Sequence, residues 1–186
     1  EAIDTFDTML ADGIEANLNN IASAAMVGKG LALYYMNNCE RSIEVFQHCI
    51  RDYPIQNALA NYDAGLALAH LGMGDVSIEK FDGCMAKTKP ESELYQRSLL
   101  HKAQVYSKTD KLDKSIELLE ELVALNPSNY EAHQILAMVY NTQGESTKAL
   151  QAVENCLKYT RNVPMCLLKA YLLDETGQVA AALDLY

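Results

Sequence analysis

The apolar residues of this chain recur at the spacing of amphipathic helices, and the helices come in pairs. Residues 96–127 hold two such apolar runs, and a polar turn at Asp110 separates them. The second run ends at Pro127. Apolar residues three or four positions apart predict helices, and proline is typical of a helix end. Ala103 in the first run and Ser115 in the second would let two antiparallel helices approach closely. The stretch therefore predicts a helical hairpin of about 34 residues.

Columns of equivalent residues repeat this hairpin along the chain. The small residue of the first helix recurs as Gly30, Gly65, Ala103, Ala137 and Ala170. The turn reads Asn37, Gly72, Asp110, Gly144 and Gly177. The second helix opens with a small residue at Ala2, Ser42, Ser77, Ser115, Ala149 and Ala182, and a large residue follows four positions later at Phe6, Phe46, Phe81, Leu119, Val153 and Tyr186. These columns predict an array of stacked hairpins, each of which buries its apolar faces against its neighbours.

The columns resemble the tetratricopeptide repeat, and the similarity covers essentially all 186 residues. The resemblance implies an all-α fold, a right-handed α-solenoid of helix-turn-helix repeats that forms an αα superhelix. The expected elements are the second helix of an incomplete repeat at 1–18, full repeats at 23–56, 58–91, 96–129 and 130–162, and a partial repeat at 163–186. We expect one continuous array cut from a longer protein, because the chain begins and stops inside a repeat.

Two details at the start of the chain follow from turn and capping preferences. Asp12 and Gly13 are typical of a helix end, so we expect the first helix to stop there. Asn19 or Asn20 would then cap the next helix, since asparagine is favoured at that position.

The charge distribution narrows the classes of partner. The net charge of −10 argues against a general nucleic-acid-binding protein, because neutralising phosphates requires clustered lysine and arginine. Residues 87–114 are an exception, since basic residues there outnumber acidic ones. This basic band, which includes Arg97, Lys102 and Lys108, fits either an acidic partner segment or an ordinary solvated helix face. No apolar run approaches the length of about 20 residues that spans a bilayer, so we expect no membrane insertion.

The sequence indicates neither a metal site, a cofactor nor a catalytic centre. Cys49, Cys84 and Cys156 occupy one column, in which other repeats carry methionine or leucine, and this predicts buried, unpaired core thiols. Such thiols point to a reducing intracellular compartment, and we expect a cytoplasmic location. The Gly-Lys-Gly segment at 28–30 lacks the further residues of a phosphate loop, so we expect it inside a helix. We therefore expect a protein that is not an enzyme.

The family resemblance also implies a binding surface, because the first helices of such hairpins line a concave groove that holds a partner peptide or helix. The groove positions of this chain are mainly apolar or neutral, which predicts contact with the apolar face of a protein partner. The candidate residues are Val27, Leu31, Tyr34, Tyr62, Leu66, Arg97, Leu100, Gln104, Gln134, Met138, Asn141, Leu167 and Tyr171. Any one of them can instead pack between neighbouring first helices.

The groove does not match the family variant that grips the C-terminal carboxylate of chaperones. That variant uses lysine, asparagine and arginine. The matching positions here include Val27, Leu31, His101 and Asp63, and the charge of Asp63 would repel a carboxylate. Only Arg97 fits the pattern of that variant. We therefore expect a non-catalytic interaction scaffold or adaptor. Two alternatives stay open, a structural subunit of a large transport, cell-cycle or RNA-processing assembly, and a regulatory segment of a larger enzyme. The apolar ends of the array also allow end-to-end self-association.

Overall fold

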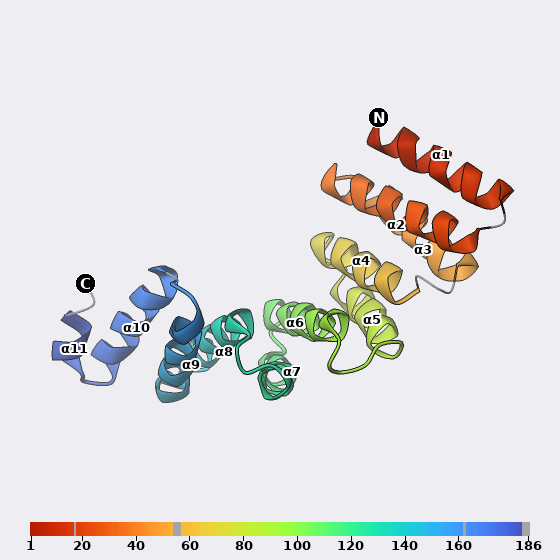
Figure 1. Cartoon of the computed structure of the whole chain (residues 1–186). Coiled ribbons are helices and arrows are strands. Elements are labelled where there is room, and N and C mark those ends of the chain that lie inside the picture. The colour runs from red at the N-terminus through yellow and green to blue at the C-terminus, as the bar shows by residue number, and fades with distance from the viewer. Residues whose placement is uncertain (17, 54–56, 162, 184–186) are drawn as a thin grey trace. The chain divides into compact units, whose positions relative to one another are not determined.

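The computed structural model describes residues 1–16, 18–53, 57–161 and 163–183, and these residues form α-helices joined by turns, with no β-strand among them (Figure 1). The helices are α1 (Ala2–Glu15), α2 (Asn19–Tyr35), α3 (Cys39–Asp52), α4 (Asn57–His70), α5 (Gly74–Met85), α6 (Glu93–Lys108), α7 (Leu112–Leu125), α8 (Tyr130–Thr142), α9 (Ser146–Tyr159), α10 (Val163–Glu175) and α11 (Val179–Leu183). The chain divides into two compact units, residues 1–105 and residues 106–186, and the division falls within α6.

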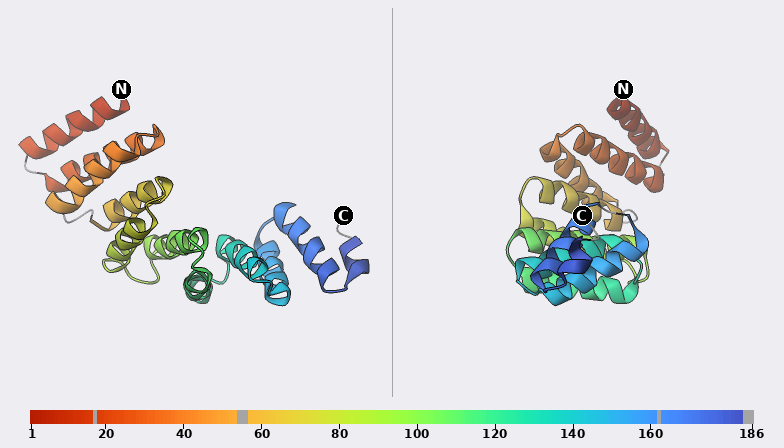
Figure 2. Two further views of the ribbon diagram at one scale, coloured as in Figure 1. Left: turned by 180° about the vertical axis from the view of Figure 1, so that it is seen from behind. Right: turned by 90° about the vertical axis from the view of Figure 1, so that its left-hand side faces the viewer.

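In the first unit each helix packs against the next one along the chain. Contacts join α1 to α2, α2 to α3, α3 to α4 and α4 to α5, and α2 also touches α4 (Figures 1 and 2). The first helices of successive pairs are therefore neighbours here. In the second unit α8 packs against both α7 and α9, and α10 packs against α9 and α11.

Every residue of the predicted turn column has a left-handed backbone. The φ angles are 60° at Asn37, 77° at Gly72, 58° at Asp110, 74° at Gly144 and 80° at Gly177. Glycine adopts this conformation without strain, and asparagine and aspartate tolerate it better than other residues. At each turn the following amide donates to the carbonyl five residues earlier, as Met73 N does to Leu68 O at 3.0 Å. This bond closes the first helix of the pair and allows the chain to reverse.

The two columns of small residues meet across the helix pairs, as their spacing predicts. Ser42 Oγ on α3 donates to the Gly30 carbonyl on α2 at 2.7 Å, and Ser77 Oγ on α5 donates to the Gly65 carbonyl on α4 at 2.8 Å. All of these contacts are buried. A Cβ atom built on Gly30 would lie 2.4 Å from the ring of Phe46. Glycine therefore lets the aromatic residue of the second helix lie directly on the first helix.

The Gly-Lys-Gly segment lies inside α2 and serves helix packing on two sides. The ring of Phe6 on α1 covers Gly28, where a Cβ atom would lie 2.3 Å away. Lys29 between the two glycines points outward and pairs with Asp7 of α1 at 2.5 Å. Close approach of α1 on one side and α3 on the other thus explains the two glycines without a phosphate ligand.

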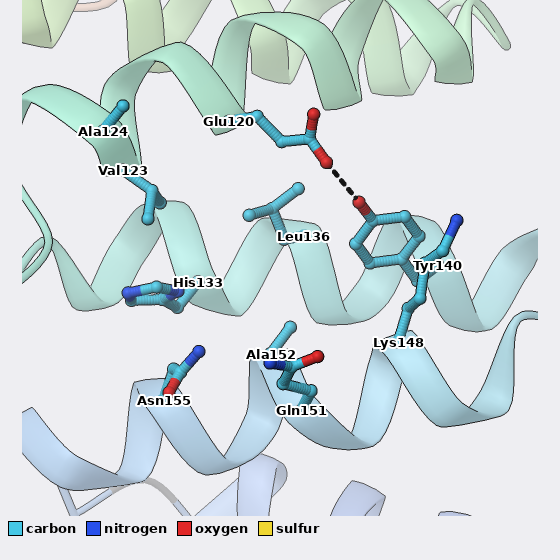
Figure 3. Close-up of a pocket in the computed structure, with 10 residues that line it drawn as sticks. All are labelled: Glu120, Val123, Ala124, His133, Leu136, Tyr140, Lys148, Gln151, Ala152 and Asn155. Atoms are coloured by element: carbon cyan, nitrogen blue, oxygen red, sulfur yellow. Dashed lines mark hydrogen bonds between the residues drawn. The ribbon is translucent and has the colours of Figure 1, made fainter.

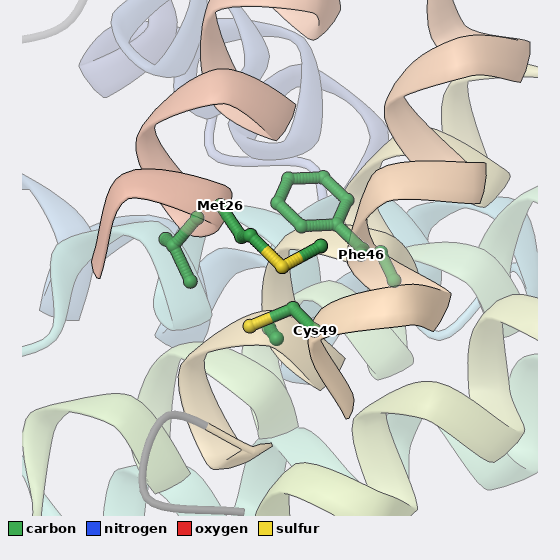
Figure 4. Close-up of a cluster of buried hydrophobic side chains, with 6 residues drawn as sticks. Met26, Phe46 and Cys49 are labelled. Carbon is green, nitrogen blue, oxygen red and sulfur yellow. The ribbon is translucent and has the colours of Figure 1, made fainter. Parts of the chain in front are cut away.

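In the core of the first unit, cysteine thiols pack among hydrophobic side chains. Met26, Phe46 and Cys49 form one buried cluster with Val27 and with alanines of α4 (Figure 4). Cys49 Sγ lies 3.7 Å from the Ser23 carbonyl. The predicted burial of Cys49, Cys84 and Cys156 is confirmed, and the structure has each of them as a free thiol.

Two expectations about the start of the chain are wrong. Helix α1 continues past Asp12 and Gly13 to Glu15, because Gly13 is buried against α2 rather than placed at a helix end. A Cβ atom on Gly13 would lie 2.8 Å from Ala22 N, so the glycine permits close packing. Leu18 precedes α2 as its N-cap without a side-chain cap, and both candidate asparagines lie inside the helix. Tyr186 and the predicted repeat ends at 56, 162 and 186 lie outside the described residues.

Candidate partner-binding surfaces

Three predicted groove residues of the first unit are buried. Val27 on α2, Tyr62 on α4 and Leu100 on α6 fill space between helices and leave little surface for a partner. For these positions, packing between neighbouring first helices describes the structure better than an open groove does. The partly exposed candidates of the same unit are Leu31, Tyr34, Leu66 and Gln104.

A ring of aromatic and charged side chains covers Tyr62. The Arg97 guanidinium lies 5.0 Å from the centroid of the Tyr62 ring, a distance at which a cation attracts the aromatic face. The rings of Phe81 and His101 lie 6.0 Å and 5.7 Å from the Tyr62 ring. Burial raises the pKa of Tyr62 to about 12, against the opposing charge of Arg97. Arg97 itself is exposed, so of this group it alone presents its charge to solvent.

Asp63 is a buried carboxylate beside this cluster. The residue is only 5% exposed, and its Oδ2 atom has no hydrogen-bond partner among the described residues. Burial raises the pKa of Asp63 to about 6, and the nearby positive charge of Arg97 opposes this rise. A carboxylate in such a position destabilises the folded state when it is ionised, because it has lost its hydration.

The second unit exposes large apolar side chains at predicted groove positions. Met138 on α8 is 52% exposed, and Leu167 and Tyr171 on α10 are 54% and 47% exposed. Leu167 and Tyr171 are four residues apart and therefore lie on one face of α10. Gln134 and Asn141 on α8 are partly exposed.

Hydrogen bonds hold the exposed tyrosine in place. The Tyr171 hydroxyl donates to Glu175 Oε1 at 2.6 Å, and Ser146 Oγ of α9 donates to Glu175 Oε2 at 3.1 Å. The bond to Glu175 raises the pKa of Tyr171, so the phenol is neutral at physiological pH. The ring is thus an ordered, amphipathic surface group of the kind that is enriched in protein interfaces.

Several cations of the basic band are engaged within the chain. Lys102 Nζ pairs with Asp82 at 2.6 Å, and its side chain is mostly buried. Lys111 and Lys114 lie 5.9 Å and 5.6 Å from the centroid of the Tyr106 ring. These contacts engage three cations of the band within the chain and so disfavour the band as a site for an acidic partner. Lys108 is exposed.

The structure also contains a cleft that the sequence reasoning missed. It lies in the second unit, with α8 as its floor, α7 on one side and α9 on the other, and its volume is about 470 Å³ (Figure 3). Leu136 and Tyr140 of α8 and Ala152 of α9 contribute to its lining. One signal was present in the sequence, because Ala152 stands in a column where other second helices carry Val45, Lys80 and Leu118.

Two searches of the described residues concern other classes of function. No group of three or more histidine, cysteine, aspartate or glutamate side chains there is arranged to hold a metal ion. None of the helices in the described part of the chain is both long enough and apolar enough to cross a membrane.

The stacked helix pairs, with a left-handed turn in each pair and buried small residues in the two columns, define a helical-repeat protein. Two models of the tetratricopeptide repeat match the sequence, one at residues 24–54 and the other at residues 100–156. The chain is a tetratricopeptide repeat protein, and it has the predicted all-α solenoid fold of that family. No curated protein sequence matches the chain.

Solved structures of other tetratricopeptide proteins share this fold at low sequence identity. MamA from Desulfovibrio magneticus RS-1 is 16% identical with a TM-score of 0.73, and the match covers 88% of this chain and 90% of that one. PilF of Pseudomonas aeruginosa is 14% identical with a TM-score of 0.76, over 99% of this chain and 88% of that one. YrrB, described as a TPR protein with an unusual peptide-binding site, is 16% identical with a TM-score of 0.72, over 95% of this chain and 88% of that one.

Proposed function

We propose that this chain is a non-catalytic scaffold that binds a helix or peptide of a protein partner through apolar side chains on the first helices of its second unit. The observation that carries the proposal is the exposure of Met138, Leu167 and Tyr171, each about half accessible although each is large and apolar. Large apolar groups that stay exposed at groove positions of the repeat are typical of candidate protein interfaces. The family supports a protein partner, and YrrB is a relative in fold whose description names a peptide-binding site.

The binding surface that we propose is smaller than the one that the repeat columns suggest. Gln134 and Asn141 on α8 would flank the apolar residues and offer hydrogen bonds to a partner backbone. Tyr62, Val27 and Leu100 are left out because they are buried. In the first unit Leu31, Tyr34 and Leu66 would contribute only their partly exposed edges.

Affinity enrichment from cell extract with three baits tests this proposal. The baits are the wild type, the triple variant Met138→Ser, Leu167→Ser, Tyr171→Ser, and a control variant Tyr35→Ser, Met36→Ser, Leu71→Ser. The control removes the same three residue types from positions that are also exposed. We expect a set of proteins to be enriched by the wild type and by the control variant but not by the triple variant. If the triple variant retains the same proteins in the same amounts, these side chains do not form the binding surface.

A further inference from the structure

The cleft of the second unit has a closed apolar floor and open walls. Leu136 and Tyr140 of α8 and Ala152 of α9 are all buried. Val123 is partly exposed and Ala124 is exposed on the α7 side, while Gln151 is exposed on the α9 side (Figure 3). A ligand in the cleft would therefore meet apolar groups at its base and at Val123 and Ala124 of α7, and polar groups at Gln151 and Asn155 of α9.

Small side chains keep the cleft open. Ala152 and Ala124 are the only lining residues whose side chains end at Cβ, and they lie on opposite sides of the cleft. At the place of Ala152, the second helix α5 carries Lys80, whose longer side chain would cover the corresponding surface. The opening is thus a property of this part of the sequence rather than of every repeat.

One end of the cleft carries a fixed network of charged groups. The Tyr140 hydroxyl donates to Glu120 Oε1 at 2.8 Å, and Lys148 Nζ lies 5.3 Å from the centroid of the Tyr140 ring (Figure 3). Burial and the bond to Glu120 raise the pKa of Tyr140 to about 12, so the phenol keeps its proton at physiological pH. Lys148 is balanced by Glu145, which lies 2.5 Å away.

The α7 side of the cleft is consequently acidic. Glu117 lies one turn before Glu120 on α7, and both residues are exposed. Lys148, the single lysine that lines the cleft, pairs with Glu145 and also interacts with Glu120, so its one positive charge does not balance the carboxylates of Glu117, Glu120 and Glu145. A partner that complements this edge carries positive charge.

We propose that this cleft is a second docking site, which takes an amphipathic helix of a partner protein with lysine or arginine along the flank that faces α7. The apolar face of that helix would lie over Leu136 and Ala152, and its cations would lie near Glu117 and Glu120. This site uses α7, α8 and α9, and it does not include Met138, Leu167 or Tyr171. It therefore stands independently of the surface on α8 and α10 proposed above.

The shape of the cleft favours a helix over a compact ligand. Small-molecule sites enclose most of the ligand surface, whereas this cleft is open along the space between two helices (Figure 3). Helix α7 has 14 residues, which corresponds to a length of about 21 Å. A partner helix of four turns would match that length, and apolar residues at helical spacing would follow the floor.

Selection from a displayed library of helical peptides tests the proposal with a defined probe. The library holds sequences of about 16 residues that are patterned for an amphipathic helix, with random apolar and flanking positions. We expect the full chain to enrich peptides that are basic on one flank. Enrichment of acidic or neutral flanks, or no enrichment at all, would overturn the proposal.

Two substitutions in the cleft locate the peptides. Ala124→Trp and Gln151→Trp each place a large side chain in the cleft, from opposite walls and at exposed positions. If one variant loses its helical content, the other still provides the test. Ala11→Trp on α1 is the matched control, because it makes the same change at another exposed helical alanine. We expect each wall variant to raise the Kd of a selected peptide by at least about tenfold, and the control to leave that Kd unchanged. Equal binding by wild type and both wall variants would contradict the assignment.

A charge reversal in the cleft and the triple variant on α8 and α10 separate the two sites. Glu117→Lys combined with Glu120→Lys should weaken the binding of basic peptides. This effect should be smaller at high salt, because exposed charges are screened. The triple variant at Met138, Leu167 and Tyr171 should bind the selected peptides as wild type does. Loss of peptide binding in that triple variant, with no loss in the wall variants, would assign the peptides to the surface on α8 and α10 instead.

Discussion

Replacing Asp63 with asparagine should stabilise the protein at neutral pH. Asp63 is buried, and its Oδ2 atom has no hydrogen-bond partner among the described residues. Asparagine has nearly the same size and shape, but it carries no charge that needs hydration. The substitution thus removes the electrostatic penalty and leaves the packing of α4 almost unchanged.

The magnitude follows from the pKa of the folded state. Burial raises the pKa of Asp63 from 3.8 to about 6, and such a shift corresponds to about 3 kcal/mol once the group is ionised in both states. Because the folded pKa is higher, the folded state binds the proton more tightly than the unfolded state does. The contribution of Asp63 to stability is therefore fully present below pH 3.8 and is lost as the pH rises through about 6. Arg97→Gln should enlarge this loss, since the charge of Arg97 opposes the rise in pKa.

Urea denaturation of wild type and Asp63→Asn at a series of pH values measures the effect. We expect the free energies of unfolding to be nearly equal at about pH 3, below the unfolded pKa of 3.8, and the variant to be up to about 3 kcal/mol more stable at about pH 8. The neighbouring Tyr62 phenol has a pKa of about 12 and does not ionise in this range. A difference that does not depend on pH, or a variant that is less stable at pH 8, would refute the reasoning.

Other predictions concern packing and thiol reactivity. Gly30→Ala should lower the free energy of unfolding by about 1–3 kcal/mol because its Cβ atom meets the Phe46 ring, and Phe46→Leu should relieve part of this loss in a double-mutant cycle. Gly72→Ala meets no neighbouring atom but has a φ of 77°, so urea denaturation should show a loss of about 1 kcal/mol from backbone strain alone. Burial raises the pKa of Cys49 to about 11, so a thiol reagent followed by mass spectrometry should label the partly exposed Cys166 well before Cys49. Labelling of Cys49 at the rate of Cys166 would contradict its buried position.

The repeat architecture could be predicted from the sequence because local chemistry determines it. A left-handed turn restricts the residue at that position, and Asn37, Gly72 and Asp110 satisfy the restriction wherever they occur in the chain. The crossing of two helices likewise restricts size, and Gly30 and Ser42 meet as their columns predict. Both constraints act within one hairpin and are therefore visible in its own sequence.

Exposure at the groove could not be predicted from the same columns. Tyr62 and Leu167 are equivalent in the repeat, but Arg97 and His101 cover Tyr62, whereas Leu167 is about half exposed. Burial of a first-helix residue depends on the side chains of the next hairpin, which a column does not describe. Gly13 shows the same limit, because its role depends on contact with Ala22 rather than on its neighbours in sequence.

A titration at two salt concentrations tests most directly whether a partner binds through apolar contacts of the second unit. Binding of a retained partner to wild type and to Leu167→Ala, Tyr171→Ala is measured at about 50 mM and about 500 mM salt. Each side chain has about half of its surface left to bury, so the double variant should bind about tenfold to a hundredfold more weakly. We expect the wild-type affinity to change little with salt. An unchanged affinity of the double variant, together with a steep loss of wild-type binding at high salt, would contradict the claim and favour an acidic partner on the basic band.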